Sequence, residues 1–344
     1  MHAFRYLGLL RERFSFLLAC LLGAGHLLVA TGVAALLSVA GTAAAQPYPD
    51  HPIKWIVPFA PGGGGDTTAR LVAREAEKLL GQPFVIDNRP GAATILGVQA
   101  LMSAPSDGYT VFSGNDSLAT NLYLLDKVPY TLDDVVGISV ISKSPLALVA
   151  RTDFPAKDLA ELMQQIKASG GRLNYGSWGI GSTSHLAMET LLDRTGANAT
   201  HVPYSGSAPA ALALISGQLD VMFIDVGTGL PYIKSGKMKL FAISTKERNP
   251  AFPDTPTLGE AALPGFDMYS WNGLWVRKGT PAPTVQKLTG AVQKVLSMPE
   301  FRKDQIERGN VPWGSTPQEL DKLLHDNAVA AKDLIQRRKI RLQQ

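Results

Sequence analysis

Short runs rich in β-branched and aromatic residues alternate along this chain with segments of helical periodicity, and this alternation restricts the fold more than any other feature. Strands separated by a helix usually run parallel in one sheet, so the pattern predicts an α/β fold. The first series has expected strands at 53–59, 84–86 and 109–112 and expected helices at 67–80 and 92–103.

A second series follows a long strand-like stretch at 135–150. Its expected elements are helix 156–168, strand 173–175, helix 184–194, strand 201–202, helix 208–216, and strands 221–224 and 240–244. An irregular segment rich in Pro and Gly at 249–265 leads to a further strand at 269–277. The terminal helices open at Thr280-Pro281 and at Thr316-Pro317, where Thr316 and Glu319 have the spacing of a capping box.

The N-terminal tract has the chemistry of an export signal. Three arginines precede residues 14–49, which contain no Asp, Glu, Lys or Arg, and Ala43 and Ala45 are the small residues that a signal peptidase needs. We therefore predict a signal peptide at 1–45, cleaved after Ala45, and a periplasmic protein. Two alternatives stay open: a retained anchor, because the apolar run is long enough to span a bilayer, and a lipid attached at Cys20.

The remainder of the chain has a balanced composition. Without residues 1–45 it holds 30 Lys and Arg against 28 Asp and Glu, and it has no cysteine, since the only one is Cys20. This balance argues against a nucleic-acid partner, and the missing cysteines exclude thiolate metal sites and disulfides. We expect neither a metal nor a cofactor. Because this length exceeds what one hydrophobic core usually encloses, we predict two lobes.

The first expected helix is specified in detail. Ala69, Val72, Ala73 and Ala76 recur at helical spacing and predict one buried stripe, with charged residues on the remaining face. Asp66 is the predicted N-cap and Gly81 the predicted end.

Three turns rich in glycine and hydroxyl groups each lead from an expected strand into an expected helix. They are Pro61 to Asp66, Trp178 to Ser184 and Tyr204 to Ser207. Such turns lie at the carboxyl ends of the strands, where α/β proteins usually bind ligands. The N–H groups at a helix start attract anions, and Ser and Thr add donors, so together the turns predict a carboxylate site without Lys or Arg. The competing interpretation is purely structural: tight turns and helix caps.

The order of motifs resembles that of a known receptor family. The matching stretches are Val57-Pro58-Phe59-Ala60-Pro61-Gly62-Gly63-Gly64-Gly65-Asp66, Asp87-Asn88-Arg89-Pro90-Gly91-Ala92, Pro105-Ser106-Asp107-Gly108-Tyr109, Gly181-Ser182-Thr183-Ser184-His185-Leu186, His201-Val202-Pro203-Tyr204 and Pro253-Asp254-Thr255-Pro256-Thr257. On these residues the chain resembles a solute receptor of a tripartite tricarboxylate transporter, the Bug family, over essentially the whole segment after the signal.

The resemblance implies a type II-like periplasmic binding protein with two lobes, each a mainly parallel sheet flanked by helices, and a ligand in the cleft between them. It implies a first lobe at 46–147 plus 271–344 and a second at 148–270. The binding residues that it implies are Phe59, Ala60, Gly63, Gly64, Gly65 and Asp66 on one wall, and Gly179, Gly181, Ser182, Thr183, Tyr204 and Ser205 on the other. To the second wall we add Trp178 and Asp225 as candidates from this sequence alone.

The implied function is capture of a small carboxylate (a di- or tricarboxylate, an aromatic acid or an amino acid) and its delivery to a membrane transporter by a monomeric receptor. Binding would close the hinge between the lobes, and the closed form would be the one that the transporter recognises. A receptor that feeds a signalling partner stays an alternative, because ligand binding and closure would look the same in sequence.

Four positions depart from the family pattern and bear on the ligand. Gly65 stands where members usually have Thr, and Ser205 stands where a basic residue is usual. Asp225 follows Ile224 where Asp-Asn is common, so its carboxylate either faces the ligand or caps a strand end. Trp178 either stacks on an aromatic acid or packs against a helix.

An enzyme is the rival class, and the sequence argues against it. The histidines after the signal are too scattered for metal-ligand spacing, and no Gly-x-Ser-x-Gly elbow presents a nucleophile. Ser182 and His185 lie close in sequence, but their position at a helix start favours a buried hydrogen-bonding role for His185 over a catalytic one. We therefore predict no catalytic residues.

Overall fold

Strand β4 (Val135–Ala150) belongs to two sheets and joins them. The structure, a computed structural model, describes residues 48–62, 64–91 and 94–342. The first sheet has the order β2 (Phe84–Asn88), β1 (Ile53–Val57), β3 (Thr110–Gly114), β9 (Tyr269–Arg277) and β4, with β10 (Val311–Pro312) also on β4. The second continues from β4 through β7 (Val221–Asp225) and β5 (Asn174–Ser177) to β6 (Thr200–Pro203), and β8 (Lys239–Ile243) also pairs with β4.

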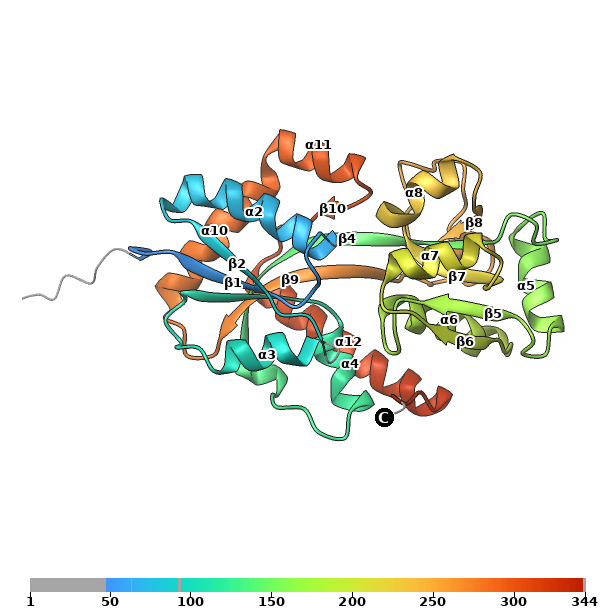
Figure 1. Cartoon of the computed structure of the whole chain (residues 1–344), viewed down its shortest axis with the longest axis horizontal. Coiled ribbons are helices and arrows are strands. Elements are labelled where there is room, and N and C mark those ends of the chain that lie inside the picture. Colours follow the sequence, from blue (N-terminus) through green and yellow to red (C-terminus); the bar gives the residue numbers. More distant parts are fainter. Residues whose placement is uncertain (1–47, 63, 92–93, 343–344) are drawn as a thin grey trace, which may run out of the picture. The chain divides into compact units, whose positions relative to one another are not determined.

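Both sheets are mixed. The predicted parallel pairing occurs where a helix connects the strands, in β1 with β2 and β3, and in β5 with β6 and β7. Strands β4 and β9 add antiparallel pairs, because each brings the chain from one lobe into the other. Figure 1 shows these two strands running side by side between the lobes. They form the connection between the two lobes.

The helices cover both sheets (Figure 1). Those of the first lobe are α2 (Gly64–Leu80), α3 (Ile95–Met102), α4 (Ser117–Leu124), α10 (Ala282–Ser297), α11 (Pro299–Glu307) and α12 (Pro317–Arg338), with a short 3-10 turn, η2 (Leu132–Asp134), before β4. Those of the second are α5 (Leu159–Ala168), α6 (Thr183–Thr195), α7 (Ser207–Ile215), α8 (Val226–Lys234) and α9 (Leu258–Ala261). The sequence analysis missed α4, α8, α9 and α11, which are short; α8 also contains Pro231, and α9 lies within the segment 249–265 that was expected to be irregular.

Helix ends follow the local sequence in most places. At the start of α12, Thr316 Oγ1 accepts the Glu319 N–H at 3.2 Å while the Glu319 carboxylate accepts the Thr316 N–H at 2.8 Å, so the predicted capping box is confirmed. Gly81 follows α2 as predicted. The prediction of Asp66 as N-cap is wrong, because α2 begins two residues earlier, at Gly64, and Asp66 lies in its first turn.

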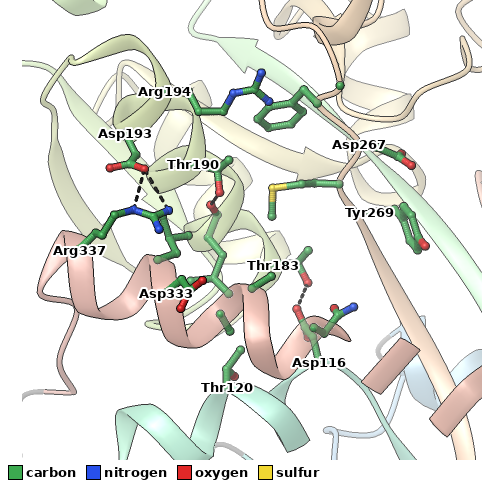
Figure 2. A pocket seen from close by; sticks show the side chains of 18 of the residues that line it. Asp116, Thr120, Thr183, Thr190, Asp193, Arg194, Asp267, Tyr269, Asp333 and Arg337 are labelled. Atoms are coloured by element: carbon green, nitrogen blue, oxygen red, sulfur yellow. Dashed lines mark hydrogen bonds and ion pairs between the residues drawn. The ribbon is translucent and has the colours of Figure 1, made fainter. Parts of the chain in front are cut away.

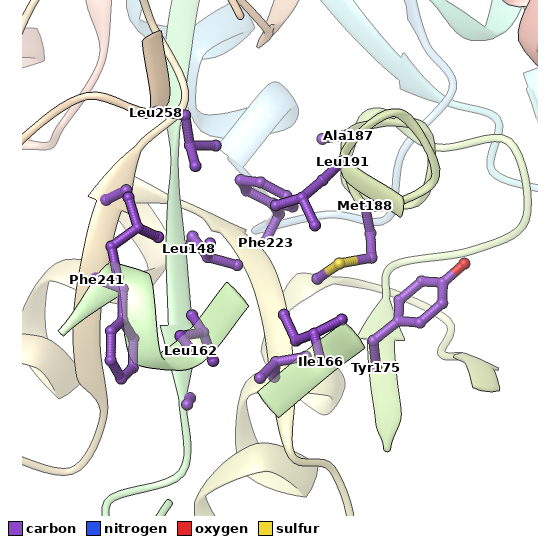
Figure 3. Packing of buried hydrophobic residues seen from close by; sticks show 14 of the residues in the cluster. Leu148, Leu162, Ile166, Tyr175, Ala187, Met188, Leu191, Phe223, Phe241 and Leu258 are labelled. Carbon is purple, nitrogen blue, oxygen red and sulfur yellow. The ribbon is translucent and has the colours of Figure 1, made fainter. Parts of the chain in front are cut away.

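Each lobe has its own hydrophobic core. In the first, Trp275, Phe112 and Leu101 pack between the sheet and α3, α4 and α12. In the second, β4, β7 and β5 contribute Leu148, Phe223 and Tyr175 against α5 and α6 (Figure 3). The near-continuous apolar run of β4 is explained by its burial in both cores.

A further apolar cluster joins the lobes. Leu334 and Ile335 of α12 and Leu124 of α4 pack with Leu186 of α6. The end of α12 adds ion pairs to α6, from Arg337 to Asp193 and from Arg338 to Glu189. The terminal helix therefore spans from the first lobe to the second, which the sequence analysis did not predict.

The predicted signal peptide, its cleavage after Ala45 and Cys20 lie outside the described residues. Within the described residues, no helix combines the length and the apolarity that crossing a membrane requires.

Candidate functional site

The first predicted turn, between β1 and α2, is held together by Asp66. This carboxylate is buried and accepts the Gly62 N–H at 2.8 Å, Arg70 Nε at 2.9 Å and Asn88 Nδ2 at 2.9 Å. Asn88 Nδ2 also donates to the Phe59 carbonyl at 3.0 Å. Burial opposes ionisation, but the hydrogen bonds from Arg70 and Gly62 lower the pKa of Asp66 below its ordinary value. Asp66 thus fixes the shape of the turn.

The glycines of this turn have unequal surroundings. A side chain at Gly65 would meet the Phe59 ring at 2.6 Å, so the ring fills the space that the threonine common in the family would need. A Cβ atom added at Gly64 would meet no atom of the described residues within 4 Å, and Gly64 and Ala60 are exposed. Gly63 lies outside the described residues. An open backbone at Gly64 is what a ligand approaching this turn requires.

The second turn, between β5 and α6, uses most of its N–H groups internally. Those of Trp178, Gly179 and Gly181 donate to Ser184 Oγ, Ser177 Oγ and His185 Nδ1, at 3.2, 3.1 and 3.0 Å. Ser182 is the N-cap of α6, and its Oγ accepts the His185 N–H at 3.4 Å. The first N–H groups of a helix have no partner within it, which applies to those of Thr183 and Ser184, and both residues are buried.

The second turn also touches the first lobe. Thr183 Oγ1 donates to Asp116 Oδ2 at 2.6 Å, and Asp116 lies in the loop between β3 and α4 (Figure 2). Next to this bond, a side chain on Gly181 would lie 2.1 Å from Leu124 of α4. The start of α6 is therefore the place where one predicted wall contacts the other lobe.

The third turn and Asp225 lie beside the second turn. Tyr204 N–H donates to the Ser177 carbonyl at 3.0 Å, and Ser205 is exposed. Asp225, at the end of β7, accepts Ser207 Oγ at 2.7 Å, which ties the start of α7 to the start of α8. Neighbouring strands thus bring the second wall together at one edge of the sheet, as the sequence predicts for parallel β5, β6 and β7.

Two residues left open by the sequence have clear surroundings. Trp178 is half-buried and packs against the second-lobe core of Figure 3. His185 is buried, its Nδ1 accepts the Gly181 N–H, and burial lowers its pKa to about 4. The Ser182 hydroxyl donates to the Gly179 carbonyl at 2.6 Å. The pair therefore shapes the turn, in agreement with the structural role predicted for His185.

Asp116 contacts the second predicted turn and was not singled out by the sequence analysis. It is only 5% exposed, and burial raises the pKa of its carboxyl group to about 6 despite the Thr183 hydrogen bond. A usable signal was present, because Asn115-Asp116-Ser117 directly follows the buried strand β3, at the same edge of the first sheet as the turn after β1.

Comparison with known proteins agrees with this architecture. A family model described as the tripartite tricarboxylate transporter family receptor, TctC, matches residues 68–340. The chain belongs to the TctC family. It is thus a solute-binding receptor of a transport family rather than an enzyme, and it has the periplasmic binding protein fold.

Three TctC relatives show how far the similarity extends. BugT of Bordetella pertussis is 33% identical over 288 residues, covering 83% of this chain and 88% of BugT. A Rhodopseudomonas palustris structure with adipate has a TM-score of 0.79 at 30% identity, covering 86% of this chain and 100% of that one. MatC from Rhodopseudomonas palustris with bound malate has a TM-score of 0.75 at 34% identity, covering 84% of this chain and 100% of that one.

Proposed function

We propose that this chain is a periplasmic receptor that captures a small carboxylate and delivers it to a membrane transporter of the tripartite tricarboxylate type. The observation that carries this proposal is the start of α6, where Ser182 caps the helix and the Thr183 and Ser184 N–H groups have no partner within the helix. Partial positive charge at a helix N-terminus favours an anion without Lys or Arg. Two TctC relatives were solved with the carboxylates adipate and malate.

The two predicted walls supply the remainder of the site. One consists of Phe59, Ala60, Gly63, Gly64, Gly65 and Asp66; the other of Trp178, Gly179, Gly181, Ser182, Thr183, Tyr204, Ser205 and Asp225. In this proposal Gly64 leaves room for the ligand, while Asp66 and Asp225 hold the turns in shape through their own hydrogen bonds. Lobe bounds of 46–147 plus 271–344 and 148–270 divide the chain at the crossing strands.

Capture proceeds by closure around the ligand. The pairing of β4 with β9 begins where Val135 lies opposite Arg277 and ends where Pro145 lies opposite Tyr269. The lobes can rotate about this pair of strands while the core of each lobe stays packed. Ligand contacts with both lobes favour the closed form, since a ligand shifts an equilibrium toward the state that it binds better. The closed form would then dock on the transporter.

Export and assembly complete the proposal. The signal peptide would be cleaved after Ala45, as the small residues before that position suggest. The receptor would act as a monomer, which suits a carrier that diffuses to the transporter. N-terminal sequencing of the protein from the periplasm should begin at Gln46.

The direct test is native mass spectrometry of the periplasmic protein, followed by thermal-shift measurements with di- and tricarboxylates, aromatic acids and amino acids. A ligand that binds only the folded state raises its stability by about 2.7 kcal/mol at a concentration one hundred times its Kd. A co-purified carboxylate, or one acid that stabilises the protein well above the others, is the expected result. No bound acid and no shift from any of them would overturn the proposal.

A further inference from the structure

One face of α6 contacts the first lobe along most of the helix. Thr183, Leu186, Glu189 and Asp193 recur at helical spacing and therefore share that face. Their first-lobe partners are Asp116 for Thr183, Leu124, Leu334 and Ile335 for Leu186, Arg338 for Glu189, and Arg337 for Asp193. Figure 2 shows the two ends of this row, the Thr183–Asp116 hydrogen bond and the Asp193–Arg337 ion pair. We call these contacts the α6 seam.

The centre of the α6 seam is removed from water. The side chains of Glu189 and Arg338 are only 9% and 20% exposed, and the hydroxyl group of buried Tyr175 donates to the same carboxylate. If the lobes parted here, Glu189 would keep Tyr175 but lose its cation, which is costly for a buried charge. Leu334 and Ile335, which are also buried, would become exposed to water. The seam therefore resists separation.

Helix α12 fixes the seam to the first lobe. Its first half contributes Leu320, Leu324 and Ala328 to the first-lobe core, and its Asn327 Oδ1 accepts Trp271 Nε1 at 3.2 Å. After Pro317 in the first turn, neither Pro nor Gly interrupts the helix up to Arg338. Because helices kink mainly at such residues, the end of α12 follows the first lobe as one rod.

The seam lies on one face of the second sheet only. Leu146 and Leu148 of β4 belong to the core that α5 and α6 cover, whereas Ala147 and Val149 belong to the core of α7 and α8. Successive residues of a strand face opposite sides of a sheet. Helices α6 and α8 therefore lie on opposite faces.

On the α8 face the lobes meet through glycine backbone. A Cβ atom added at Gly309, after α11, would lie 2.7 Å from Gly227 Cα, and one added at Gly227 would lie 2.7 Å from the Arg308 carbonyl oxygen. Among residues 48–62, 64–91 and 94–342, neither an ion pair nor a side-chain hydrogen bond joins the lobes at this glycine contact. Separation there leaves no buried charge without a partner.

Most of the proposed binding walls are on the side of the glycine contact. The first turn leads into α2, the third into α7, and Asp225 directly precedes α8. Helix α2 packs with α10, and α10 packs with α11, whose following loop forms the glycine contact. Figure 1 shows α2, α10 and α11 on one side of the first sheet and α4 and α12 on the other.

We propose that the α6 seam is the pivot of this receptor. It stays closed together with β4 and β9 while the lobes part at the glycine contact, so the ligand enters between α2 and the starts of α7 and α8. This inference rests on the proposed function, because it names the side at which a receptor that closes around its ligand opens.

Two pairs of spin labels test the pivot by electron–electron distance measurements. In the full chain with Cys20→Ser, introduced cysteines are the only ones. Arg74→Cys with Leu212→Cys reports the distance between α2 and α7, and Asn198→Cys with Gln336→Cys reports the distance across the seam. All four positions are exposed.

The first comparison needs no ligand. Gly227→Ala adds a methyl group that fits beside the Arg308 carbonyl only when the lobes part there. It should lengthen the α2–α7 distance by more than about 2 Å, as a hinge motion does, and change the seam distance by less than that. Gly290→Ala is the matched control, because its methyl group on α10 would meet no described atom within 4 Å, and it should change neither distance.

The second comparison adds adipate, malate or glutamate to the protein with Gly227 in place. An acid that binds should shorten or narrow the α2–α7 distances and leave the seam distance unchanged. Arg338→Met, which removes the cation from Glu189, should broaden the seam distances; Arg337→Met should do so less, because the Arg337 side chain is 57% exposed.

The outcomes separate the pivot from the function on which it rests. If the seam distance changes as much as the α2–α7 distance, with an acid or in Gly227→Ala, the seam is not the pivot. The same follows if Arg338→Met leaves the seam distances narrow. If no acid binds in the thermal-shift screen, the receptor proposal fails, whereas the Gly227→Ala comparison still decides where the lobes part.

Discussion

The turns after β1 and after β5 look alike in sequence, but their glycines serve different purposes. At the first turn, a side chain on Gly64 would meet no described atom within 4 Å. At the second, a side chain on Gly181 would lie 2.1 Å from Leu124 of the other lobe. The first turn keeps its backbone open, whereas the second brings its backbone against α4. A glycine-rich turn therefore indicates close approach, and only the structure shows whether a ligand or another part of the chain approaches.

Gly181→Ala should break the second turn and have the largest effect. Gly181 has a φ of +77°, which alanine adopts only with strain, and the added methyl group would overlap Leu124. Together these effects should lower the free energy of unfolding by about 3 kcal/mol. Urea unfolding measures this loss. The double variant Gly181→Ala/Leu124→Ala should lose less stability than the sum of the two single losses, because removing the Leu124 side chain relieves the overlap. Strictly additive losses would contradict the proposed contact.

Asp116→Asn should stabilise the ligand-free protein. The folded pKa of about 6 lies above the unfolded value of 3.8, so stability from the protonated form is complete below about pH 3.8 and is lost as the pH rises through about 6. A neutral amide avoids that loss and should gain about 3 kcal/mol at pH 7.5 but much less at about pH 4. Thermal unfolding across this range would contradict the prediction if the gain did not depend on pH.

Asp66→Asn should loosen the first turn and lower stability, with a pH dependence opposite to that of Asp116→Asn. The folded pKa of Asp66 is lowered, so its contribution is present above the unfolded value and lost as the pH falls through the folded one. We expect a loss of about 1 kcal/mol at pH 7, kept small because Arg70 is half-exposed. Chemical unfolding should show a smaller loss of stability at about pH 3 than at pH 7. A loss that does not change with pH would indicate that Asp66 contributes through packing rather than through its charge.

Gly64→Leu should have the smallest effect on stability and abolish ligand binding. The added Cβ atom would meet no described atom within 4 Å and Gly64 is exposed, so the free energy of unfolding should change by less than about 0.5 kcal/mol. The same side chain would occupy the space proposed for the ligand. Calorimetric titration with the best ligand is the measurement, and unchanged affinity would remove the first turn from the site.

The sequence predicted the fold well because most of its determinants are local. The apolar runs of β4 and β9 gave their bounds directly, and the Thr316 capping box located the start of α12. Local signals failed at α4 and α8, because α4 contains Ser117, Thr120 and Asn121 and α8 contains two glycines and Pro231, residues that disfavour a helix interior.

The site was predictable only in part. The sequence located the turns, since strand-to-helix connections place them at the carboxyl edges of the sheets. It could not show that the Gly179 and Gly181 N–H groups donate within the turn, or that Asp116 meets Thr183. Asp116 and Thr183 are 67 positions apart in the chain, so their contact depends on how the two lobes come together.

The pairing of Pro145 with Tyr269 has a consequence for how such receptors diversify. The chain leaves the first lobe and returns to it through neighbouring positions of one strand pair, so the whole intervening segment is a single insertion with adjacent ends. An exchange of that segment between relatives needs only two junctions and leaves the first sheet intact. Recombination at these junctions would exchange the second lobe as a unit in a single step.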